Sequence, residues 1–396
     1  MLDARPVEGY DKSYKYMCHS RIEIIDSFDT WKRMAGEWND LLNRSSANAV
    51  FLTWEWLFSW AGCYLDEKRK LFILGVYRDH ELIGIAPWYI HHVKYRLLGI
   101  RQIEFLGSPE AGSDYLDVIA KRGKEQEVAA SLYRFLLDQG RSLWDSMLLR
   151  EIPSSSLFLL HFLDKIEGDG KYAEIRHNSY CPIVSLPASR GDFVSALSSN
   201  RREQFRRHWR LLKNQADIEH RSYSAAGCDM ALNELFSLYK DKSKYYNESV
   251  HQFIGKFVSH CDKKDWLQVD FLTADNRNIA GLLHLRYHGD LGMYLMAVDK
   301  DFNPKISIGN VLVGLAIENA VEQGLYRYDF LKGNENYKFH WADKGRRSLS
   351  IFFCQKKLSP LMFTTERFIR STAKILFRSV VVCTALGLID RISCSL

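Results

Sequence analysis

The segment YLMAVDKDFNPKISIGNVLVGLAIENAVEQGLYRYDFLKGNENYKFHW, residues 294–341, decides the expected fold. Tyr294–Val298 is a short apolar run typical of a strand, and turn residues follow it. From Gly309 or Asn310, apolar residues recur at helical spacing, and Gly324 stands where a C-cap glycine belongs. Tyr326–Leu331 has the pattern of a second strand. A strand, a helix and a strand form the usual crossover between parallel strands.

The start of this helix has the features of an anion site. A helix N-terminus offers unpaired N–H groups and a partial positive charge, so it can hold a phosphate. Glycine at this position lets a ligand approach the backbone closely. The candidate phosphate-binding residues are Ser307, Ile308, Gly309 and Asn310. Polar side chains also follow the second strand, at the end where open α/β sheets bind ligands; they are Asp329, Lys332, Glu335, Tyr337, Lys338 and His340.

Length and composition favour a two-domain globular protein. The chain has 396 residues, of which 46% are hydrophobic and 26% charged, and a formal net charge of +6. This charge suits an anionic cofactor or substrate but argues against a nucleic-acid partner. The cysteines lack the spacing of a metal or disulfide framework, so we expect no metal and reduced thiols. We find no signal peptide and no spanning apolar run, and we expect a cytoplasmic protein.

The order of predicted elements suggests an internal duplication. The hairpin VYRDHELIG, ending at Gly84, matches in kind TADNRNIAG, ending at Gly281. Downstream, LLDQGRSLWDSMLLRE (136–151) aligns without a gap to AVEQGLYRYDFLKGNE (320–335). Chance matching of two generic α/β halves is the alternative. We therefore expect an α/β (α+β) protein with two tandem domains, each a twisted mixed sheet flanked by helices.

The expected boundaries follow from changes in composition along the chain. They are a flexible N-terminus (1–20), an N-terminal domain (21–187), a C-terminal domain (188–356) and a basic helical tail (357–396). The N-terminal half has acidic residues, Glu125 and Glu127, where its helix starts, and these would repel a phosphate. It also lacks a counterpart of Tyr337-Lys338. We expect only the C-terminal half to hold a cofactor.

The sequence resembles one protein family in particular segments. They are FLTWEWLFSW, ELIGIAPWYI, FLGSPEAGSDYLDVI, LSSNRREQFRRHWRLLK and YDFLKGNENYKFHWAD, within residues 20–355. With the order of elements, they resemble GNAT acyltransferases of the CelD/BcsL type, linked to bacterial cellulose and exopolysaccharide synthesis. These are tandem GNAT proteins akin to the FemAB transferases. The loop PKISIGN departs from the usual Q/R-x-x-G-x-G/A pattern and has a single glycine.

The resemblance implies an acyl-CoA co-substrate, acetyl-CoA or a longer one. Tyr337 lies where a GNAT tyrosine protonates the departing thiolate, and a buried aromatic residue is the alternative. Asp329 and Glu335 are candidate bases, and Asp329 can instead orient Lys338 or pair with Arg327 or Lys332. Lys338, like Lys332, can clamp an anion or be solvated surface. Backbone groups of three residues can contact pantetheine: Met296, Ala297 and Val298.

The expected function is N- or O-acyl transfer to a glycan, glycolipid or amino-sugar precursor. A FemAB-type aminoacyl-tRNA-dependent transferase and a non-catalytic GNAT-fold scaffold are the alternatives. The arginine-rich stretch 201–210 can bind CoA phosphate, glycan, lipid headgroup or tRNA, or be a solvated helix face. The basic tail, with Arg367, Arg370, Lys374 and Arg378, can contact the inner face of the membrane or pack against the C-terminal domain.

Overall fold

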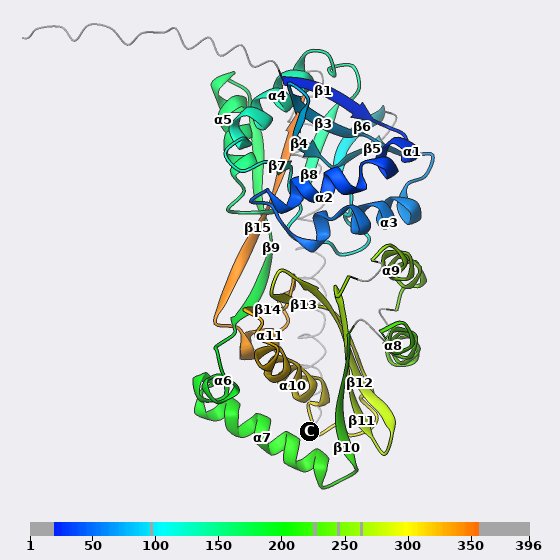
Figure 1. Cartoon of the computed structure of the whole chain (residues 1–396), viewed down its shortest axis with the longest axis vertical. Helices are drawn as coiled ribbons and strands as arrows, with labels where there is room; N and C mark the ends of the chain where they lie inside the picture. Colours follow the sequence, from blue (N-terminus) through cyan, green and yellow to red (C-terminus); the bar gives the residue numbers. More distant parts are fainter. Residues whose placement is uncertain (1–19, 96–97, 225–227, 244–245, 262–263, 356–396) are drawn as a thin grey trace, which may run out of the picture.

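The computed structural model describes residues 20–95, 98–224, 228–243, 246–261 and 264–355. Two halves are stacked along the long axis of the molecule, with the N-terminal half in blue and cyan (Figure 1). The predicted tail helix lies outside the described residues, as does the predicted flexible N-terminus apart from Ser20.

The N-terminal half contains an aromatic helical layer and short strands. Thr53 caps α3, because its hydroxyl accepts a hydrogen bond from the Trp56 N–H. The helical spacing of Trp31, Ala35, Trp38 and Leu42 predicts one helix over Phe28–Leu42, but the structure has two, because the helix is interrupted at Met34. The elements are β1 (Ser20–Ile25), α1 (Phe28–Arg33), α2 (Ala35–Asn43), the 3-10 helix η1 (Val50–Leu52), α3 (Trp54–Tyr64), β2 (Arg69–Leu71), β3 (Ile73–Arg78), β4 (Glu81–Ala86), β5 (Trp88–Tyr95), β6 (Leu98–Phe105), β7 (Ile119–Ala120), α4 (Glu125–Leu137), β8 (Ser146–Pro153) and α5 (Leu157–Gly168).

The C-terminal half contains the predicted strand–helix–strand unit. The spacing of Phe205, Trp209 and Leu212 within a basic segment predicts one helix over Arg190–Gln215. This prediction is wrong, because the extended backbone of Leu197 divides the segment into two helices. The elements are β9 (Ala173–Ser185), α6 (Arg190–Ala196), α7 (Ser199–Lys213), β10 (Ile218–Ser224), α8 (Cys228–Lys242), α9 (Glu248–His260), β11 (Leu267–Ala274), β12 (Arg277–Tyr287), β13 (Asp290–Val298), α10 (Ile308–Glu322), β14 (Arg327–Asp329), α11 (Lys338–Trp341) and β15 (Lys344–Cys354).

One mixed sheet runs through both halves. Its order is β10-β11-β12-β13-β14-β9-β15-β8-β6-β5-β2, and a separate smaller sheet has the order β1-β3-β4-β7. The long strands β9 and β15 pair with each other along most of their length. β9 then pairs with β14 of the C-terminal half, and β15 with β8 of the N-terminal half (Figure 1). This confirms the expected mixed α/β fold.

The two halves repeat the same order of elements. β3, β4–β5, β6, α4 and β8 correspond to β11, β12, β13, α10 and β14. Each opening hairpin has a two-residue turn, at Asp79-His80 and at Asp275-Asn276. Each also has one extra residue at the same place on its second strand, Ile83 in one and Ile279 in the other. This register aligns Gly84 with Ala280 rather than with Gly281. In both halves the helix connects parallel strands, β6 with β8 and β13 with β14.

The segment after β6 departs from the sequence prediction. The apolar pattern of Tyr115–Ala120 predicts a strand, but only Ile119 and Ala120 form one, β7. Tyr115 has a left-handed φ of 54°, which interrupts an extended chain. The Leu116 N–H donates to the Glu151 carbonyl (3.0 Å), so the segment lies against β8. Residues 106–118, here named the crossing loop, thereby reach the junction of the two halves.

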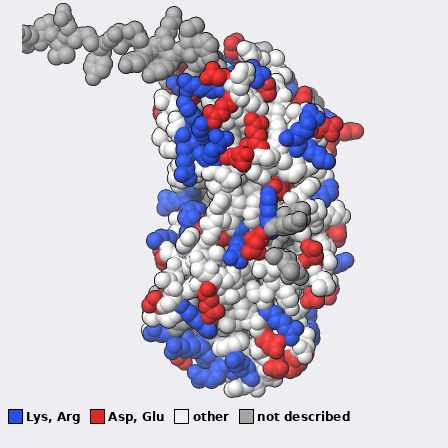
Figure 2. Space-filling model, viewed as in Figure 1, with Lys and Arg blue, Asp and Glu red and all other residues white. Residues whose placement is uncertain are grey.

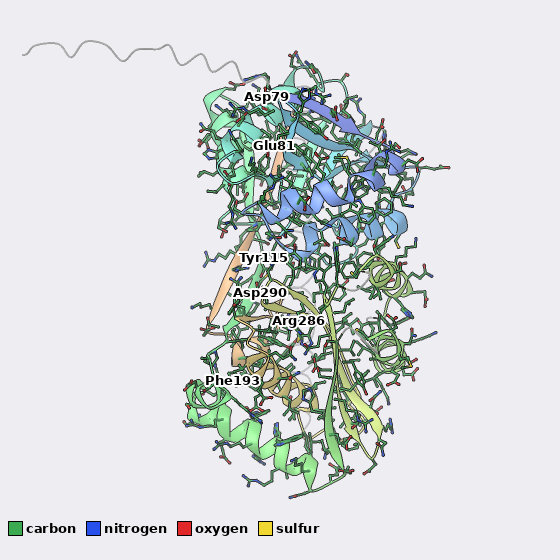
Figure 3. The ribbon with its side chains drawn as sticks, viewed as in Figure 1. Asp79, Glu81, Tyr115, Phe193, Arg286 and Asp290 are labelled. Atoms are coloured by element: carbon green, nitrogen blue, oxygen red, sulfur yellow. The ribbon has the colours of Figure 1, made fainter. Side chains whose placement is uncertain are left out.

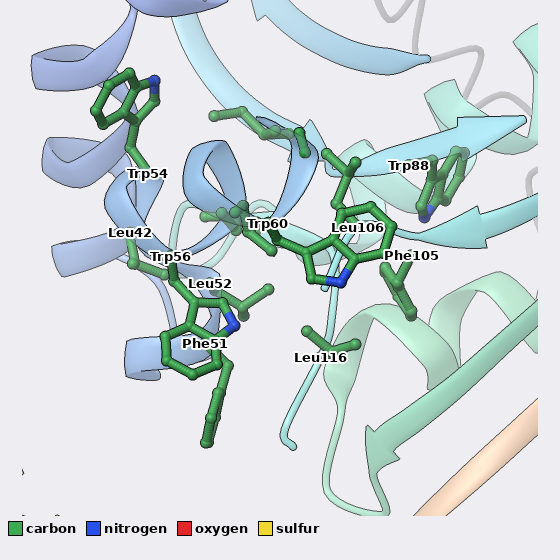
Figure 4. Packing of buried hydrophobic residues seen from close by; sticks show 14 of the residues in the cluster. Leu42, Phe51, Leu52, Trp54, Trp56, Trp60, Trp88, Phe105, Leu106 and Leu116 are labelled. Atoms are coloured by element: carbon green, nitrogen blue, oxygen red, sulfur yellow. The ribbon is translucent and has the colours of Figure 1, made fainter. Parts of the chain in front are cut away.

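Large aromatic side chains fill the core beneath this loop (Figure 4). Trp56, Trp60 and Trp88 are fully buried, together with Leu106 and Leu116 of the crossing loop. The Trp56 indole N–H donates to the Ser113 hydroxyl (2.8 Å). The aromatic stretch around Trp56 therefore holds the crossing loop in place.

Candidate active site

Strands β13 and β14 pair over only a short length and then separate. Their parallel pairing covers Asp290–Gly292 and Arg327–Asp329. Directly after it, Tyr294 is an extra residue on β13, because Leu283 pairs with Leu295 and His284 with Met293. A bulge bends its strand and increases the local twist. Beyond Gly292, the edge of β13 that faced β14 is therefore open.

A cavity of about 950 Å³ lies where the strands separate. Its lining comes from β13, from the segment after β14, from the end of α8 and from the crossing loop of the other half. Five predicted site residues line it: Met296, Val298, Glu335, Tyr337 and Lys338. Ala297, which lies between Met296 and Val298 on β13, is buried and is not part of the cavity lining. The cavity thus gathers residues separated by more than half of the chain.

The start of α10 lies behind one wall of this cavity. A Cβ on Gly309 would stand 3.1 Å from the Met296 Sδ and 3.1 Å from the Val298 Cγ2. Glycine is thus needed for the helix to approach β13 closely. Ser307 is the N-cap and makes no side-chain hydrogen bond to the first turn. Ser307, Ile308, Gly309 and Asn310 adjoin the wall without being part of the cavity lining.

Tyr337 and Lys338 begin the short helix α11. Burial, followed by the charge of Glu335, raises the pKa of the Tyr337 phenol, so it stays protonated at neutral pH. The Lys338 ammonium donates to the Lys332 carbonyl (2.8 Å) and pairs with the Glu335 carboxylate (3.1 Å). Lys338 is therefore a buried, held cation rather than solvated surface.

Asp329 forms hydrogen bonds with partners other than those that the sequence suggested, which were Lys338, Arg327 and Lys332. One carboxylate oxygen accepts from the Tyr115 hydroxyl (2.6 Å) and the other from the Leu331 N–H (2.8 Å). Arg327 pairs instead with Asp290 (2.7 Å). Burial raises the pKa of Asp329. Tyr115 belongs to the crossing loop and lies at the junction of the halves (Figure 3), so this hydrogen bond joins them.

A second connection between the halves is built around Lys332. Its ammonium donates to the Ser113 carbonyl (3.2 Å) and lies 3.3 Å from Glu151 Oε1 and 3.5 Å from Asp114 Oδ1. Its backbone N–H donates to Asp114 Oδ2 (2.9 Å). Sequence reasoning singled out Lys332 but missed Asp114. The signal was present as acidic residues after a Gly/Ser/Pro loop, in GSPEAGSDYLD.

The pKa values of the two carboxyl groups beside Lys332 are shifted in opposite directions. Burial raises the pKa of Asp114 to about 7, against the opposing charge of Lys332. Burial also disfavours the Glu151 carboxylate, but the Lys332 charge and the Ser179 and Ser348 hydroxyls hold its pKa below the ordinary value. Burial likewise opposes the Lys332 charge, yet the two carboxyls raise the pKa of Lys332. Opposed shifts of this kind are typical of acid–base sites.

Three residues at this junction have left-handed backbones. The φ angles are 54° for Tyr115, 60° for Glu151 and 54° for Leu331. Residues other than glycine adopt the left-handed region at a cost of about 1–3 kcal/mol, and residues in such conformations cluster at functional sites. Leu331 also separates the large cavity from a second one of about 330 Å³ on its other side. Residues lining the second cavity include Tyr115, Asp117, Asp329 and Arg346.

The C-terminal half matches a known domain family. Residues 199–339 match the family described as acetyltransferase (GNAT) domain. This part of the chain is therefore similar to GNAT acetyltransferase domains. The match includes β13, α10, β14 and the cavity between the strands. No curated protein matches the sequence.

Solved structures share the fold of nearly the whole chain. A conserved protein of unknown function from Bacteroides thetaiotaomicron has 11% identity and a TM-score of 0.52, covering 85% of this chain and 100% of its own. FemX has 9% identity and a TM-score of 0.51, covering 82% of this chain and 96% of its own. L-PGS from Bacillus licheniformis has 11% identity and a TM-score of 0.50, covering 83% and 94%. At such identities the likeness concerns the fold.

In the part of the chain that the structure describes, no three His, Cys, Asp or Glu side chains are grouped so that they can hold a metal ion. Among the helices of the described ranges, none has both the length and the apolar character needed to cross a bilayer.

Proposed function

We propose that the chain transfers an acyl group from acyl-CoA, either acetyl-CoA or a longer acyl-CoA, to an acceptor bound in the large cavity. The observation that carries this proposal is the cavity itself, which opens where β13 and β14 separate within the acyltransferase domain. The open edge of β13 offers backbone N–H and C=O groups of Met296, Ala297 and Val298 to an extended pantetheine arm.

The start of α10 supplies the site for the CoA phosphates. Because Ser307 leaves the first turn without a side-chain cap and the Ile308 N–H already donates to the Ile306 carbonyl (2.9 Å), the N–H groups of Gly309 and Asn310 are the ones we propose for an anion. Gly309 keeps the helix close to β13, so the phosphates and the thioester would bind to adjoining elements. This arrangement supports the sequence-based assignment of Ser307, Ile308, Gly309 and Asn310.

The chemistry belongs to the segment after β14. The acceptor nucleophile attacks the thioester carbonyl, the C–S bond breaks, and the thiolate takes a proton from the Tyr337 phenol. Lys338 is a buried cation in the same cavity and can stabilise the developing oxyanion. Glu335 pairs with Lys338 and holds it. Each oxygen of the Asp329 carboxylate already accepts a hydrogen bond. Its proposed part in catalysis is therefore to hold Tyr115 and Leu331 beside the cavity.

The acceptor is proposed from the sequence resemblance. The CelD/BcsL-type motifs suggest a glycan, glycolipid or amino-sugar precursor of exopolysaccharide or cell-envelope synthesis. Polar side chains of α8 and α9 in the cavity lining, including Lys242 and Asn247, suit hydroxyl and amino groups of a sugar.

One observation favours a second candidate, an aminoacyl-tRNA-dependent transferase. Helix α7 carries five arginines and one lysine against one glutamate, a net charge of +5, whereas the whole chain has only +6. It lies on the outside of the C-terminal half (Figure 1), where basic side chains gather at the lower end (Figure 2). Its Arg201 and His208 lie beside Asn310 at the start of α10. Such a surface can take a polyanionic donor.

Calorimetric titration with acetyl-CoA and with longer acyl-CoAs tests the main proposal. Tyr337→Phe should lower thiol release by about 10²–10⁴-fold and leave donor affinity nearly unchanged, because the proton is needed in the transition state. Tyr172→Phe, at an exposed tyrosine, is the matched control and should be neutral. Absence of binding by every acyl-CoA would refute the proposal and favour the tRNA-dependent or scaffold alternatives.

A further inference from the structure

We propose that Asp114, which the N-terminal half contributes, is the general base that removes the proton from the acceptor. This inference rests on the proposed acyl transfer and adds a catalytic residue to the same cavity. It also assigns a catalytic part to the half that is expected to bind no cofactor.

Asp114 is held at the wall of the cavity, and one of its carboxyl oxygens makes no hydrogen bond. The residue is only 1% exposed, and it lines the large cavity from the crossing loop. Its Oδ2 accepts the Lys332 backbone N–H (2.9 Å), which fixes the orientation of the carboxyl group. Its Oδ1 has no hydrogen-bond partner among the described residues, and the Lys332 ammonium stands 3.5 Å away. A buried carboxylate oxygen without a donor is costly, so its retention suggests a functional role.

The other carboxyls of the cavity and its wall are committed elsewhere. Both oxygens of Asp329 accept hydrogen bonds. Glu151 is held by two serine hydroxyls and Lys332. Glu335 is more than half exposed and pairs with Lys338. Glu110 also has an unpartnered oxygen, but its ion pair with Arg69 (2.7 Å) is closer than that of Asp114 with Lys332 (3.5 Å), and its side chain is 24% exposed.

The surroundings of Asp114 give it a useful proton affinity. Burial raises its pKa to about 7, so near neutral pH it exists in both forms and can accept a proton. Several titratable groups face it, from β8, β9, β13, β14 and the segment after β14. They are Lys332, Glu151, Asp329, Cys181 and Tyr294.

The proposed step is balanced. Asp114 Oδ1 takes the proton from an amine or hydroxyl of the acceptor while the acceptor nitrogen or oxygen bonds to the thioester carbonyl carbon. The C–S bond breaks, and the thiolate takes the Tyr337 proton. Solvent exchange returns a proton from Asp114 to the medium and one to Tyr337. The sum is acceptor plus acyl-CoA giving acylated acceptor plus free thiol.

The test compares two buried aspartates of the same region in the full-length chain. Asp114→Asn keeps an oxygen for the Lys332 N–H but cannot accept a proton. The control is Asp117→Asn, because Asp117 is also buried, also has a pKa raised by burial to about 7, and lines the smaller cavity. Donor affinity by calorimetry, thermal melts and the pH profile of kcat/KM are measured for both variants and the wild type.

We expect wild-type kcat/KM to fall tenfold per pH unit below a pKa near 7. Asp114→Asn should lose about 10²–10⁴-fold in kcat/KM, lose this acid limb and keep donor affinity. Asp117→Asn should keep both rate and profile. A wild type that transfers the acyl group, with Asp114→Asn retaining its rate and acid limb, would overturn the inference about Asp114 alone. A wild type that binds no acyl-CoA would overturn the proposed function and, with it, this role.

Discussion

Removing the Tyr115 hydroxyl is expected to weaken the junction of the two halves. Tyr115→Phe deletes the donor to Asp329 Oδ2 (2.6 Å) and retains the ring, over which the Arg346 guanidinium lies 5.4 Å from the centroid. The change therefore isolates one hydrogen bond to a buried carboxyl. A hydrogen bond to a charged partner contributes about 1.5–3 kcal/mol, and the unpaired Asp329 oxygen adds its own cost of desolvation. We expect the free energy of unfolding to fall by about 2–3 kcal/mol.

The loss should depend on pH with a definite sign. The hydroxyl favours the ionised form of Asp329, whose pKa burial has already raised. Without it the folded-state pKa rises further, because the ionised form loses a donor. A raised folded pKa for an acid means that stability is lost as pH rises through the range between the unfolded and folded values. The destabilisation should therefore be large at about pH 8 and small where Asp329 is protonated.

Urea denaturation of the wild type and the variant at about pH 5 and pH 8 measures both quantities. Tyr287→Phe is the control, because the Tyr287 hydroxyl donates to the neutral Asn48 side chain (2.8 Å). It should cost about 0.5–1.5 kcal/mol at either pH. Equal losses for the two variants, without a pH dependence in Tyr115→Phe, would show that Asp329 does not rely on this hydroxyl.

Three further outcomes are expected. Calorimetry should give one acyl-CoA per chain, and two equivalent sites would contradict the expected asymmetry of the halves. Gly314→Leu should destabilise the protein by at least about 1–3 kcal/mol in thermal melts, because even a Cβ at Gly314 would stand 2.8 Å from Trp341; Gly36→Ala, with open space around it, is the control. Removal of residues 360–396 should abolish flotation with anionic liposomes, and equal flotation of both chains would exclude a membrane contact through the tail.

Local patterns predicted the central unit well. The helical spacing and Gly324 located α10, and Gly324 has the left-handed φ of 71° that a C-cap glycine adopts. The polar cluster after β14 was also visible, since strand ends with dense polar residues are local features. The helix boundary expected at Gly309 or Asn310 falls at Ile308 in the structure, which is within the usual uncertainty of helix ends.

The crossing loop could not be predicted in the same way. Its partners are far away in sequence, because Tyr115 bonds to Asp329 and Asp114 to Lys332. Neither pairing leaves a periodic signal. The apolar run at Tyr115–Ala120 resembles a strand, and only the contact with Glu151 shows that tertiary structure prevails over local preference. For the same reason, sequence reasoning named Asp329 and Glu335 as candidate bases and did not consider Asp114, which we propose from the structure.

The repeated order of elements explains how the N-terminal half can contribute to the proposed site although we expect it to bind no cofactor. Strands β6 and β8 pair only at Gln102-Ser146 and Ile103-Met147 before they separate, as β13 and β14 do. In the N-terminal half the crossing loop lies against β8 beyond this point, through the bond from Leu116 to Glu151. The space that we propose for a ligand in the C-terminal half is thus crossed by the chain itself in the N-terminal half. The same loop places Asp114 in the lining of the cavity of the C-terminal half. One segment therefore fills the space in the N-terminal half and contributes a side chain to the cavity of the other half.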